Sequence, residues 1–151
     1  KLRARTGQME QGEQLAMLRK LKFFHDFSQT EISEVHKASI WQQYGPGEEV
    51  VREGDMDDRF YVVVAGDCKV ERNGVVVGQL STGDCFGESS YVPGARRSAS
   101  VRTSGNVTVL KVGATLLEQA SASCQLRFNR VFLRSLIERL QKSEQATAAG
   151  Q

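Results

Sequence analysis

Turn-forming residues interrupt the central part of the chain, from Ile40 to Val112, about every 8–12 residues. Most interruptions pair glycine with proline, asparagine or aspartate, which favour tight turns. The segments between them are short and rich in valine, a residue that fits the pleated, half-buried surface of a strand. This regular spacing predicts an antiparallel barrel or sandwich. The turn sequences are Gly45-Pro46-Gly47, Gly54-Asp55, Gly66-Asp67, Asn73-Gly74 and Gly83-Asp84.

The sharpest hairpin signal is Asn73-Gly74, because a type I′ turn needs positive φ at both central positions. Residues 60–65 and 75–80 are predicted as strands beside these turns. Neither Pro46 nor Pro93 falls inside a predicted central strand, where proline would remove a ladder hydrogen bond.

Sequence patterns predict helices toward both ends of the chain. Residues 8–22 carry large apolar side chains at every third position, and Ser28 with Glu31 forms a capping-box pattern that predicts a second helix to about residue 38. Residues 115–118 are predicted as a short helix and 123–142 as a long one, whereas the small, polar residues 143–151 are expected to fray.

The long C-terminal helix carries a narrow apolar stripe, with arginines expected on its opposite side. The stripe comprises Leu126, Leu133, Ile137 and Leu140, widened by Leu136 and Phe132, and the arginines are Arg127, Arg130 and Arg134. The breadth of this apolar arc suggests that one side of the helix meets something besides its own barrel.

The chain has 151 residues, which suits one domain, and its net charge of +2 is too small to predict binding to nucleic acid or to a membrane. Charge is uneven, with six basic and two acidic residues in 1–22, and six acidic and one basic in 48–58. Both runs are expected to be solvated surface. The chain starts at Lys1 rather than Met, as a piece of a longer protein would.

The three cysteines, Cys68, Cys85 and Cys124, are odd in number and lack Cys-x-x-Cys spacing, which argues against a disulfide framework or a zinc site. Reduced thiols in a cytoplasmic protein fit best. The sequence has no signal-peptide pattern and no apolar run long enough to span a bilayer.

The segment 86–101 concentrates groups that suit a sugar joined to a phosphate. It holds Phe86-Gly87-Glu88 and, nine residues after the glutamate, Arg97-Ser98-Ala99. A guanidinium can bind a phosphate through two parallel hydrogen bonds, and a carboxylate can accept a hydrogen bond from a sugar hydroxyl. Small residues beside the arginine leave backbone N–H groups open to phosphate oxygens.

This segment resembles the phosphate-binding cassette of the cyclic nucleotide-binding domain family, which includes the catabolite activator protein and the regulatory subunits of cyclic-nucleotide-dependent kinases. The family pattern of Phe-Gly-Glu, a short helix, then Arg, two small residues, a Ser/Thr-like residue and an apolar one is met at positions 86–88 and 97–101. The likeness extends to residues 45–49, 53–55 and 60–66, and covers about residues 15–142.

The resemblance implies an α+β, mainly β fold. Its core would be an eight-stranded antiparallel jelly-roll (double-stranded β-helix) barrel, flanked by N-terminal helices and a long C-terminal helix. The expected organisation is a lead-in or linker at 1–8, the domain at 9–142 and a flexible tail at 143–151. Within the domain, 9–39 are N-terminal helices, 40–112 the barrel with the cassette at 86–101, and 113–142 the C-terminal helices.

The resemblance also implies the ligand-binding residues: Phe86, Gly87, Glu88, Ser89, Arg97, Ser98 and Ala99. Arg97 is the expected phosphate partner, in preference to Arg96, because Ser98-Ala99 follow it directly. Glu88 is expected to accept the ribose 2′-hydroxyl, and it could equally stabilise a helix N-terminus. Ser98 could reach the phosphate or the base, or face solvent.

The cassette departs from the family pattern in two places. Ser89-Ser90 stands where relatives often carry apolar residues, and Pro93 should end the cassette helix near Tyr91 or Val92. A buried phosphodiester needs a compensating charge in any case, so these departures bear on selectivity and packing more than on the Arg97 contact.

In the family the C-terminal helix swings over the occupied pocket. Candidate lid residues are Phe128 and Val131, with Phe132 beside them, while Arg127 or Arg130 could reach a base edge. The alternative is that these apolar residues are core or dimer surface.

Three function classes follow. The first is a regulatory sensor that binds a cyclic mononucleotide, cyclic AMP favoured over cyclic GMP, and repositions its terminal helices to control an attached effector such as a protein kinase. The second is a ligand-free scaffold for protein interaction. The third, a metal-dependent enzyme on a similar barrel, is disfavoured because His25 and His36 both precede the predicted strands. No cofactor or metal is expected. Nucleic acid and membrane are not expected partners, and a homodimer through the C-terminal helix is a candidate.

Overall fold

The computed structural model describes residues 9–149, with side chains through Lys142. The expected lead-in at 1–8 and the end of the tail at 150–151 lie outside these residues. The described elements run in the order α2 (Gln11–Lys20), η1 (Lys22–Phe24), α3 (Gln29–Lys37), β1 (Ser39–Tyr44), β2 (Glu49–Val51), β3 (Arg59–Ala65), β4 (Cys68–Arg72), β5 (Val75–Leu80), β6 (Cys85–Phe86), η2 (Glu88–Tyr91), β7 (Ser100–Thr103), β8 (Val107–Gly113), α4 (Ala114–Leu117) and α5 (Ala122–Ala149).

The strands form two antiparallel four-stranded sheets, ordered β1-β8-β3-β6 and β2-β7-β4-β5. This confirms the antiparallel β core that the turn spacing predicts. Asn73 and Gly74 join β4 to β5 with φ of 52° and 78°, so both central residues of the hairpin turn have the positive φ that was predicted.

Strand β3 is buried on both faces, which explains its uninterrupted apolar sequence. Because side chains alternate along a strand, Phe60, Val62 and Val64 face the helices, whereas Tyr61 and Val63 face the space between the two sheets. One apolar cluster therefore joins the sheet to the helices, and a second fills the interior between the sheets.

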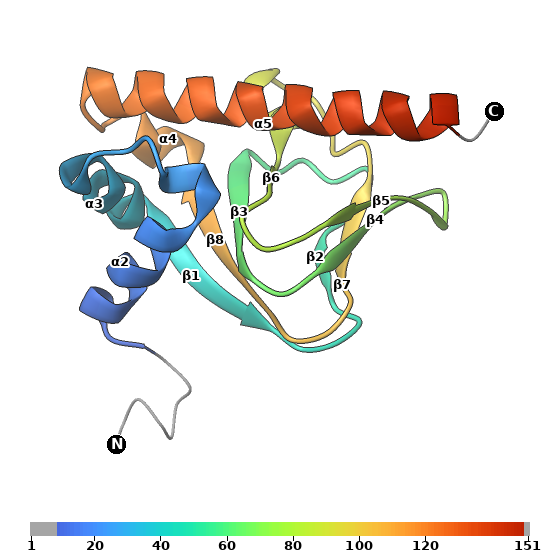
Figure 1. The fold of residues 1–151 in the computed structure, drawn as a ribbon, viewed down its shortest axis with the longest axis horizontal. Coiled ribbons are helices and arrows are strands. Elements are labelled where there is room, and N and C mark those ends of the chain that lie inside the picture. The colour runs from blue at the N-terminus through green and yellow to red at the C-terminus, as the bar shows by residue number, and fades with distance from the viewer. Residues whose placement is uncertain (1–8, 150–151) are drawn as a thin grey trace.

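The helices gather at one end and along one side of the sheets, with α5 running across both of them (Figure 1). The predicted capping box at the start of α3 is present: Glu31 N–H donates to Ser28 Oγ over 3.1 Å, and Ser28 N–H donates to Glu31 Oε1 over 2.9 Å. Helix α5 continues to Ala149, beyond the end at Lys142 that the sequence pattern predicts.

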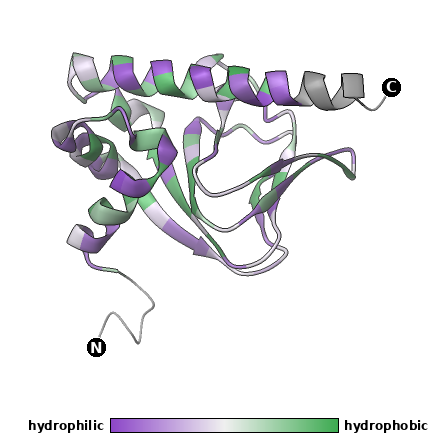
Figure 2. Ribbon diagram, in the orientation of Figure 1, coloured by the Kyte–Doolittle hydropathy of each residue, from purple (hydrophilic) through white to green (hydrophobic). Residues whose placement is uncertain are grey.

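The exposure of the side chains on α5 differs from what the apolar stripe predicts. Leu126, Leu133, Ile137 and Leu140 are between 46% and 60% exposed, so the stripe points outward. The buried face carries Cys124, Phe128, Val131 and Phe132 instead. At 100° per residue, Arg127 and Arg134 lie on a flank between these two faces and not opposite the stripe. Apolar and polar residues consequently alternate along the helix in Figure 2.

Two arginines of α5 and a serine just before the helix are held by acidic side chains of the N-terminal helical segment. Arg127 pairs with Glu31 at 3.3 Å, and Arg134 pairs with Asp26 at 2.7 Å. Ser121, just before the helix, donates its hydroxyl to Glu34 over 2.8 Å. The first half of α5 is thereby tied to the N-terminal helices.

All three cysteines are free, as the sequence predicts, and the structure shows that they are also buried. Burial raises the pKa of Cys68 and of Cys124 to about 11, and that of Cys85 to about 12. The thiols therefore stay protonated and unreactive near neutral pH. Across residues 9–149, we find no helix whose length and hydropathy would let it cross a bilayer.

Candidate functional site

The seven predicted ligand-binding residues lie around one pocket of about 820 Å³. The cassette forms one wall, the β4–β5 hairpin contributes side chains including Val70, Arg72 and Gln79, and the C-terminal half of α5 completes the enclosure. The sequence signal and the hollow in the fold therefore coincide.

Arg97 is the buried charge of this pocket, with only 5% of its surface exposed. Its Nη1 donates to Ser89 Oγ over 2.8 Å, and its Nη2 donates to the Arg59 carbonyl over 2.6 Å. Nη2 also lies 3.4 Å from Asp57 Oδ2. The end of the guanidinium is thus fixed by helix η2, by the start of β3 and by the loop before β3.

One donor of this side chain is left over. Within the described part of the chain, Arg97 Nε is the only buried side-chain nitrogen or oxygen that has no hydrogen-bond partner. An unpaired buried donor on a cation is costly, so the group is suited to an acceptor that arrives from outside. Arg97 lines the pocket, and a phosphate oxygen entering there meets this need.

Arg96 takes a different place from its neighbour. It is exposed, and its Nη1 donates to the Gly54 carbonyl over 2.9 Å. Arg97 is therefore the inward-facing arginine of the two, as predicted. Both residues lie in the loop before β7, which begins at Ser100.

An aromatic layer supports the guanidinium. The rings of Tyr61 and Phe86 stack with centroids 4.7 Å apart, and the Arg97 Cζ lies 5.7 Å from the Tyr61 centroid. The Tyr61 hydroxyl donates to Asp57 Oδ2 over 2.5 Å. Burial, together with this hydrogen bond to a carboxylate, raises the pKa of Tyr61, so the phenol stays neutral.

Gly87 must be glycine for two separate reasons. Its φ is +108°, which L side chains rarely adopt, and a Cβ there would stand 2.6 Å from the Arg59 carbonyl oxygen and 3.3 Å from Arg97 Nη1. The absence of a side chain lets the cassette turn pass close to the guanidinium.

The other cassette residues are more open. Glu88 is exposed and accepts a hydrogen bond from Gly87 N–H over 3.1 Å. Ser98 is exposed and Ala99 half-buried, and both line the pocket. Helix η2 ends at Tyr91, which confirms the short cassette helix predicted from Pro93, though it is a 3₁₀ helix.

The structure places the candidate lid residues away from the pocket. Phe128 and Val131 are 0% and 4% exposed, and the Phe128 ring packs 5.4 Å from that of Phe60 in the core. Arg127 pairs with Glu31, and Arg130 is exposed. The aromatic face of α5 is occupied by core packing, so these residues have no path to the ligand in this arrangement.

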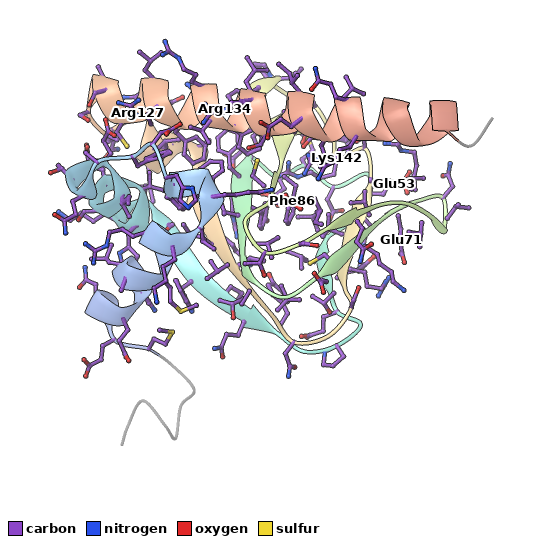
Figure 3. All side chains as sticks on the ribbon, in the orientation of Figure 1. Glu53, Glu71, Phe86, Arg127, Arg134 and Lys142 are labelled. Carbon is purple, nitrogen blue, oxygen red and sulfur yellow. The ribbon has the colours of Figure 1, made fainter. Side chains whose placement is uncertain are left out.

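Residues further along α5 form the pocket wall instead: Leu136, Arg139, Leu140 and Lys142. Figure 3 shows Phe86 below α5, at a position along the helix between Arg134 and Lys142. The sequence did not predict this segment as a pocket wall, because the candidate lid residues were chosen beside the aromatic side chains of the helix. The pocket lies about two turns later along the helix.

Asp57 and Tyr61 were also missed. Asp57 belongs to the acidic run 48–58, which was expected to be solvated surface, but its side chain is only 21% exposed. Tyr61 alternates with core valines in β3, and nothing in that pattern separates a support for arginine from ordinary core.

A second pocket of about 780 Å³ shares Ser89 with the first. It is lined by three carboxylates, those of Asp55, Asp57 and Asp58, with Arg59 and Lys111 beside them. This balance of charge disfavours a phosphate, so the pocket that Arg97 lines is the better candidate for an anion.

Comparison with known proteins gives a consistent result. The family model for the cyclic nucleotide-binding domain matches residues 41–124. A cGMP-dependent protein kinase of Toxoplasma gondii is 27% identical over 132 residues, which cover 87% of this chain and 13% of the kinase. A cAMP-dependent protein kinase regulatory subunit of Debaryomyces hansenii is 32% identical over 97 residues, covering 64% of this chain and 22% of the subunit.

Among solved structures, a cyclic nucleotide-binding domain from Methylobacillus flagellatus superposes with a TM-score of 0.78 at 21% identity, covering 91% of this chain and 82% of that one. This likeness shows the fold. The chain spans no more than 22% of either kinase-related relative, so it corresponds to one module of such proteins.

Proposed function

Because this chain belongs to the cyclic nucleotide-binding domain family, we propose that it binds a cyclic mononucleotide in the pocket around Arg97. The observation that carries the proposal is the buried guanidinium whose Nε–H has no partner and which lines this pocket. A cyclic phosphodiester is a single negative charge with acceptor oxygens, which is what that donor lacks.

The remaining cassette residues have distinct roles in this proposal. Gly87 lets the phosphate approach the backbone, and Glu88 accepts the ribose 2′-hydroxyl. Ser89 holds the guanidinium through Nη1, while Ser98 and Ala99 leave room beside the phosphate. Phe86 supports the aromatic layer below Arg97.

The expected affinity is moderate. A cyclic nucleotide has about 22 non-hydrogen atoms, and about −0.3 to −0.4 kcal/mol per atom gives roughly −7 to −9 kcal/mol, near a micromolar Kd. Arg97→Ala leaves the buried anion unpaired and should weaken binding at least about tenfold in a calorimetric titration. Arg96→Ala, one residue away and exposed, is the matched control and should bind like the wild type. Equal binding by both variants would refute the assignment of Arg97.

We propose a regulatory role, in which ligand binding repositions the terminal helices and controls an attached effector such as a protein kinase. Helix α5 supports this because its C-terminal half lines the pocket while Arg127 and Arg134 hold the N-terminal helical segment. A ligand that contacts α5 can therefore bias the arrangement of both ends, provided that it binds the two arrangements unequally. We propose that the chain binds its ligand without catalysing a reaction. We also propose that the two sheets are connected as a jelly roll and that the protein is cytoplasmic.

The identity of the base is a finer question. The relatives include a cGMP-dependent kinase and a regulatory subunit of a cAMP-dependent kinase, so both nucleotides are candidates. The sequence leans to cyclic AMP without settling the base, because Ser98 is compatible with cyclic AMP while a hydroxyl beside the arginine can also favour guanine.

A ligand-free scaffold is the second candidate, and one observation favours it: Arg97 is already engaged by Asp57, Ser89 and the Arg59 carbonyl. The two candidates differ in a thermal melt. A binding domain gains stability as RT ln(1 + [L]/Kd), so millimolar cyclic AMP or cyclic GMP should raise the Tm clearly. An unchanged Tm with both nucleotides would favour the scaffold.

A homodimer through α5 is our proposal for the outward-facing leucine stripe. Leu126 and Leu133 are seven residues apart, with Ile137 one turn beyond, a spacing at which two helices can interlock. Leu140 continues the repeat but also lines the ligand pocket, so the seam is assigned to the first three residues.

A further inference from the structure

The walls of the pocket are unequal in hydrogen-bonding character. Once Arg97 is assigned to the phosphate and Glu88 to the ribose, the charged side chains that remain on the lining are Arg72, Arg139 and Lys142, all of them cations. A cyclic mononucleotide has no second negative group for them. Its base is the part that is left to meet these donors.

Two of these cations are anchored by backbone groups beside the cassette. Arg72 Nε donates to the Ser98 carbonyl over 3.1 Å, and Arg139 Nη1 donates to the Cys85 carbonyl. An arginine has five N–H groups, so each keeps donors beyond the one that anchors it. Lys142 follows Arg139 by three residues on α5, which places the two on neighbouring positions of the same helix face.

Neutral groups that can accept a hydrogen bond are few on this wall. The side chains of Gln79 and Ser98 line the pocket and can accept, whereas Ser89 Oγ already contacts Arg97. The base therefore meets more donors than acceptors on the pocket side chains.

The two purines respond differently to such a wall. Guanine offers acceptors at O6 and N7, which an arginine or lysine can bind together, whereas adenine offers N7 beside an amino donor at position 6. Adenine would turn that amino group toward cations that cannot accept from it. It would therefore offer this wall one acceptor where guanine offers two. The N1 and N2 donors of guanine can use Gln79 or Ser98.

We propose that the pocket selects guanine over adenine through O6, read by the cationic wall of Arg72, Arg139 and Lys142. This rests on the proposed function, because it presupposes that a cyclic nucleotide occupies the pocket. It reverses the preference for cyclic AMP over cyclic GMP, because Ser98 carries one hydroxyl that can face either base, whereas three donor side chains line the wall.

The test is a set of calorimetric titrations of the wild-type chain with cyclic GMP, cyclic AMP and cyclic IMP. Cyclic IMP carries O6 and N7 but no 2-amino group, so it isolates the feature that the wall is proposed to read. One good bidentate contact to a base corresponds to a discrimination of about fivefold or more. Cyclic GMP and cyclic IMP should both bind at least about fivefold more tightly than cyclic AMP.

Cyclic AMP binding as tightly as cyclic GMP would overturn the proposal and leave the proposed function intact. Cyclic IMP behaving like cyclic AMP would also overturn it, because the 2-amino group would then be what is read. If none of the three binds, the proposed function and the selectivity fall together.

Variants locate the effect on the wall. The double variant Arg139→Gln/Lys142→Gln should weaken cyclic GMP several-fold while changing cyclic AMP little, so the ratio of the two Kd values contracts. Arg134→Gln on the same helix is the matched control, because Arg134 pairs with Asp26 away from the pocket, and its ratio should equal that of the wild type. An equal loss for both nucleotides in the double variant would indicate general electrostatic attraction and contradict base reading.

Discussion

Arg97 and Asp57 form an ion pair in which Nη2 lies 3.4 Å from Oδ2, and the arginine lines the ligand pocket whereas the aspartate does not. Asp57 is itself held, because it accepts from the Tyr61 hydroxyl over 2.5 Å and from Arg59 N–H over 3.1 Å. The carboxylate therefore fixes the guanidinium relative to β3. It also neutralises the buried charge of Arg97 when no anion is bound.

Replacing this carboxylate should test its positioning role. Asp57→Asn keeps the shape but removes the negative charge, which leaves Arg97 less well fixed, and we expect the free energy of unfolding to fall by about 1–3 kcal/mol. Chemical denaturation measures this. Asp58→Asn, at the exposed neighbouring position, is the control and should stay within about 0.5 kcal/mol of the wild type. Similar losses in both variants would show that only the net charge of the loop matters.

The same carboxylate predicts a pH dependence. Burial alone would raise the pKa of Asp57, but hydrogen bonds from Tyr61 and Arg59 and the charge of Arg97 outweigh it, so the pKa lies below its ordinary value. A depressed folded-state pKa means that the stabilisation is present above about pH 4 and is lost as pH falls through the folded pKa. Denaturation curves between pH 6 and 2.5 should therefore show the wild type approaching Asp57→Asn in stability at the acid end. A constant difference across this range would contradict the shift.

Gly87 offers a test of the close approach between the cassette turn and the guanidinium. Gly87→Ala combines a strained positive φ with a contact of 2.6 Å to the Arg59 carbonyl, whereas Gly94→Ala has positive φ, +75°, but nothing within 4 Å of the new Cβ. Backbone strain of about 1–3 kcal/mol is common to both. Gly87→Ala should lose more stability than Gly94→Ala in parallel melts, and more nucleotide affinity in titrations. Equal losses would mean that φ alone matters at Gly87.

Sequence patterns predicted the elements that depend on local chemistry. The Asn73-Gly74 hairpin, the Ser28–Glu31 capping box and the end of the cassette helix at Tyr91 all follow from residues that are adjacent or three apart. The resemblance also named seven residues that line one pocket.

What the sequence could not supply depends on which distant surfaces meet. Helix α5 is apolar on two faces, and only the position of the barrel determines that Phe128 turns inward and Leu133 outward. Likewise, Asp57 is one of six acids in residues 48–58, and only the approach of Arg97 from the cassette distinguishes it from the others.

A side-chain hydrogen bond between the cassette and α5 predicts measurable coupling. The Tyr91 hydroxyl donates to Asn129 Oδ1 over 2.7 Å, while its ring packs against Phe60 and Phe132. Tyr91→Phe keeps the ring packing and should cost about 0.5–1.5 kcal/mol of unfolding free energy.

A double-mutant cycle with Asn129→Ala isolates that bond. If the bond is made as in the structure, the double variant should lose little more than either single variant. Fully additive losses would show that the hydroxyl and the amide do not interact.

Substitutions on the outward face of α5 should affect association without affecting stability. Leu133 and Ile137 are 57% and 46% exposed, so Leu133→Glu/Ile137→Glu should barely change the unfolding free energy of a single chain. Phe132→Ala, at the fully buried neighbouring position, should cost about 3–5 kcal/mol.

Association should respond in the opposite way. If two copies pair through the leucine stripe, light scattering should show the wild type with twice the mass of one chain at high concentration. The charged double variant should stay at the mass of one chain, because like charges would face each other in the seam. A wild-type protein that remains monomeric at high concentration would refute the homodimer and leave the stripe available for another partner, whereas an unfolded double variant would show that the stripe contributes to the core after all.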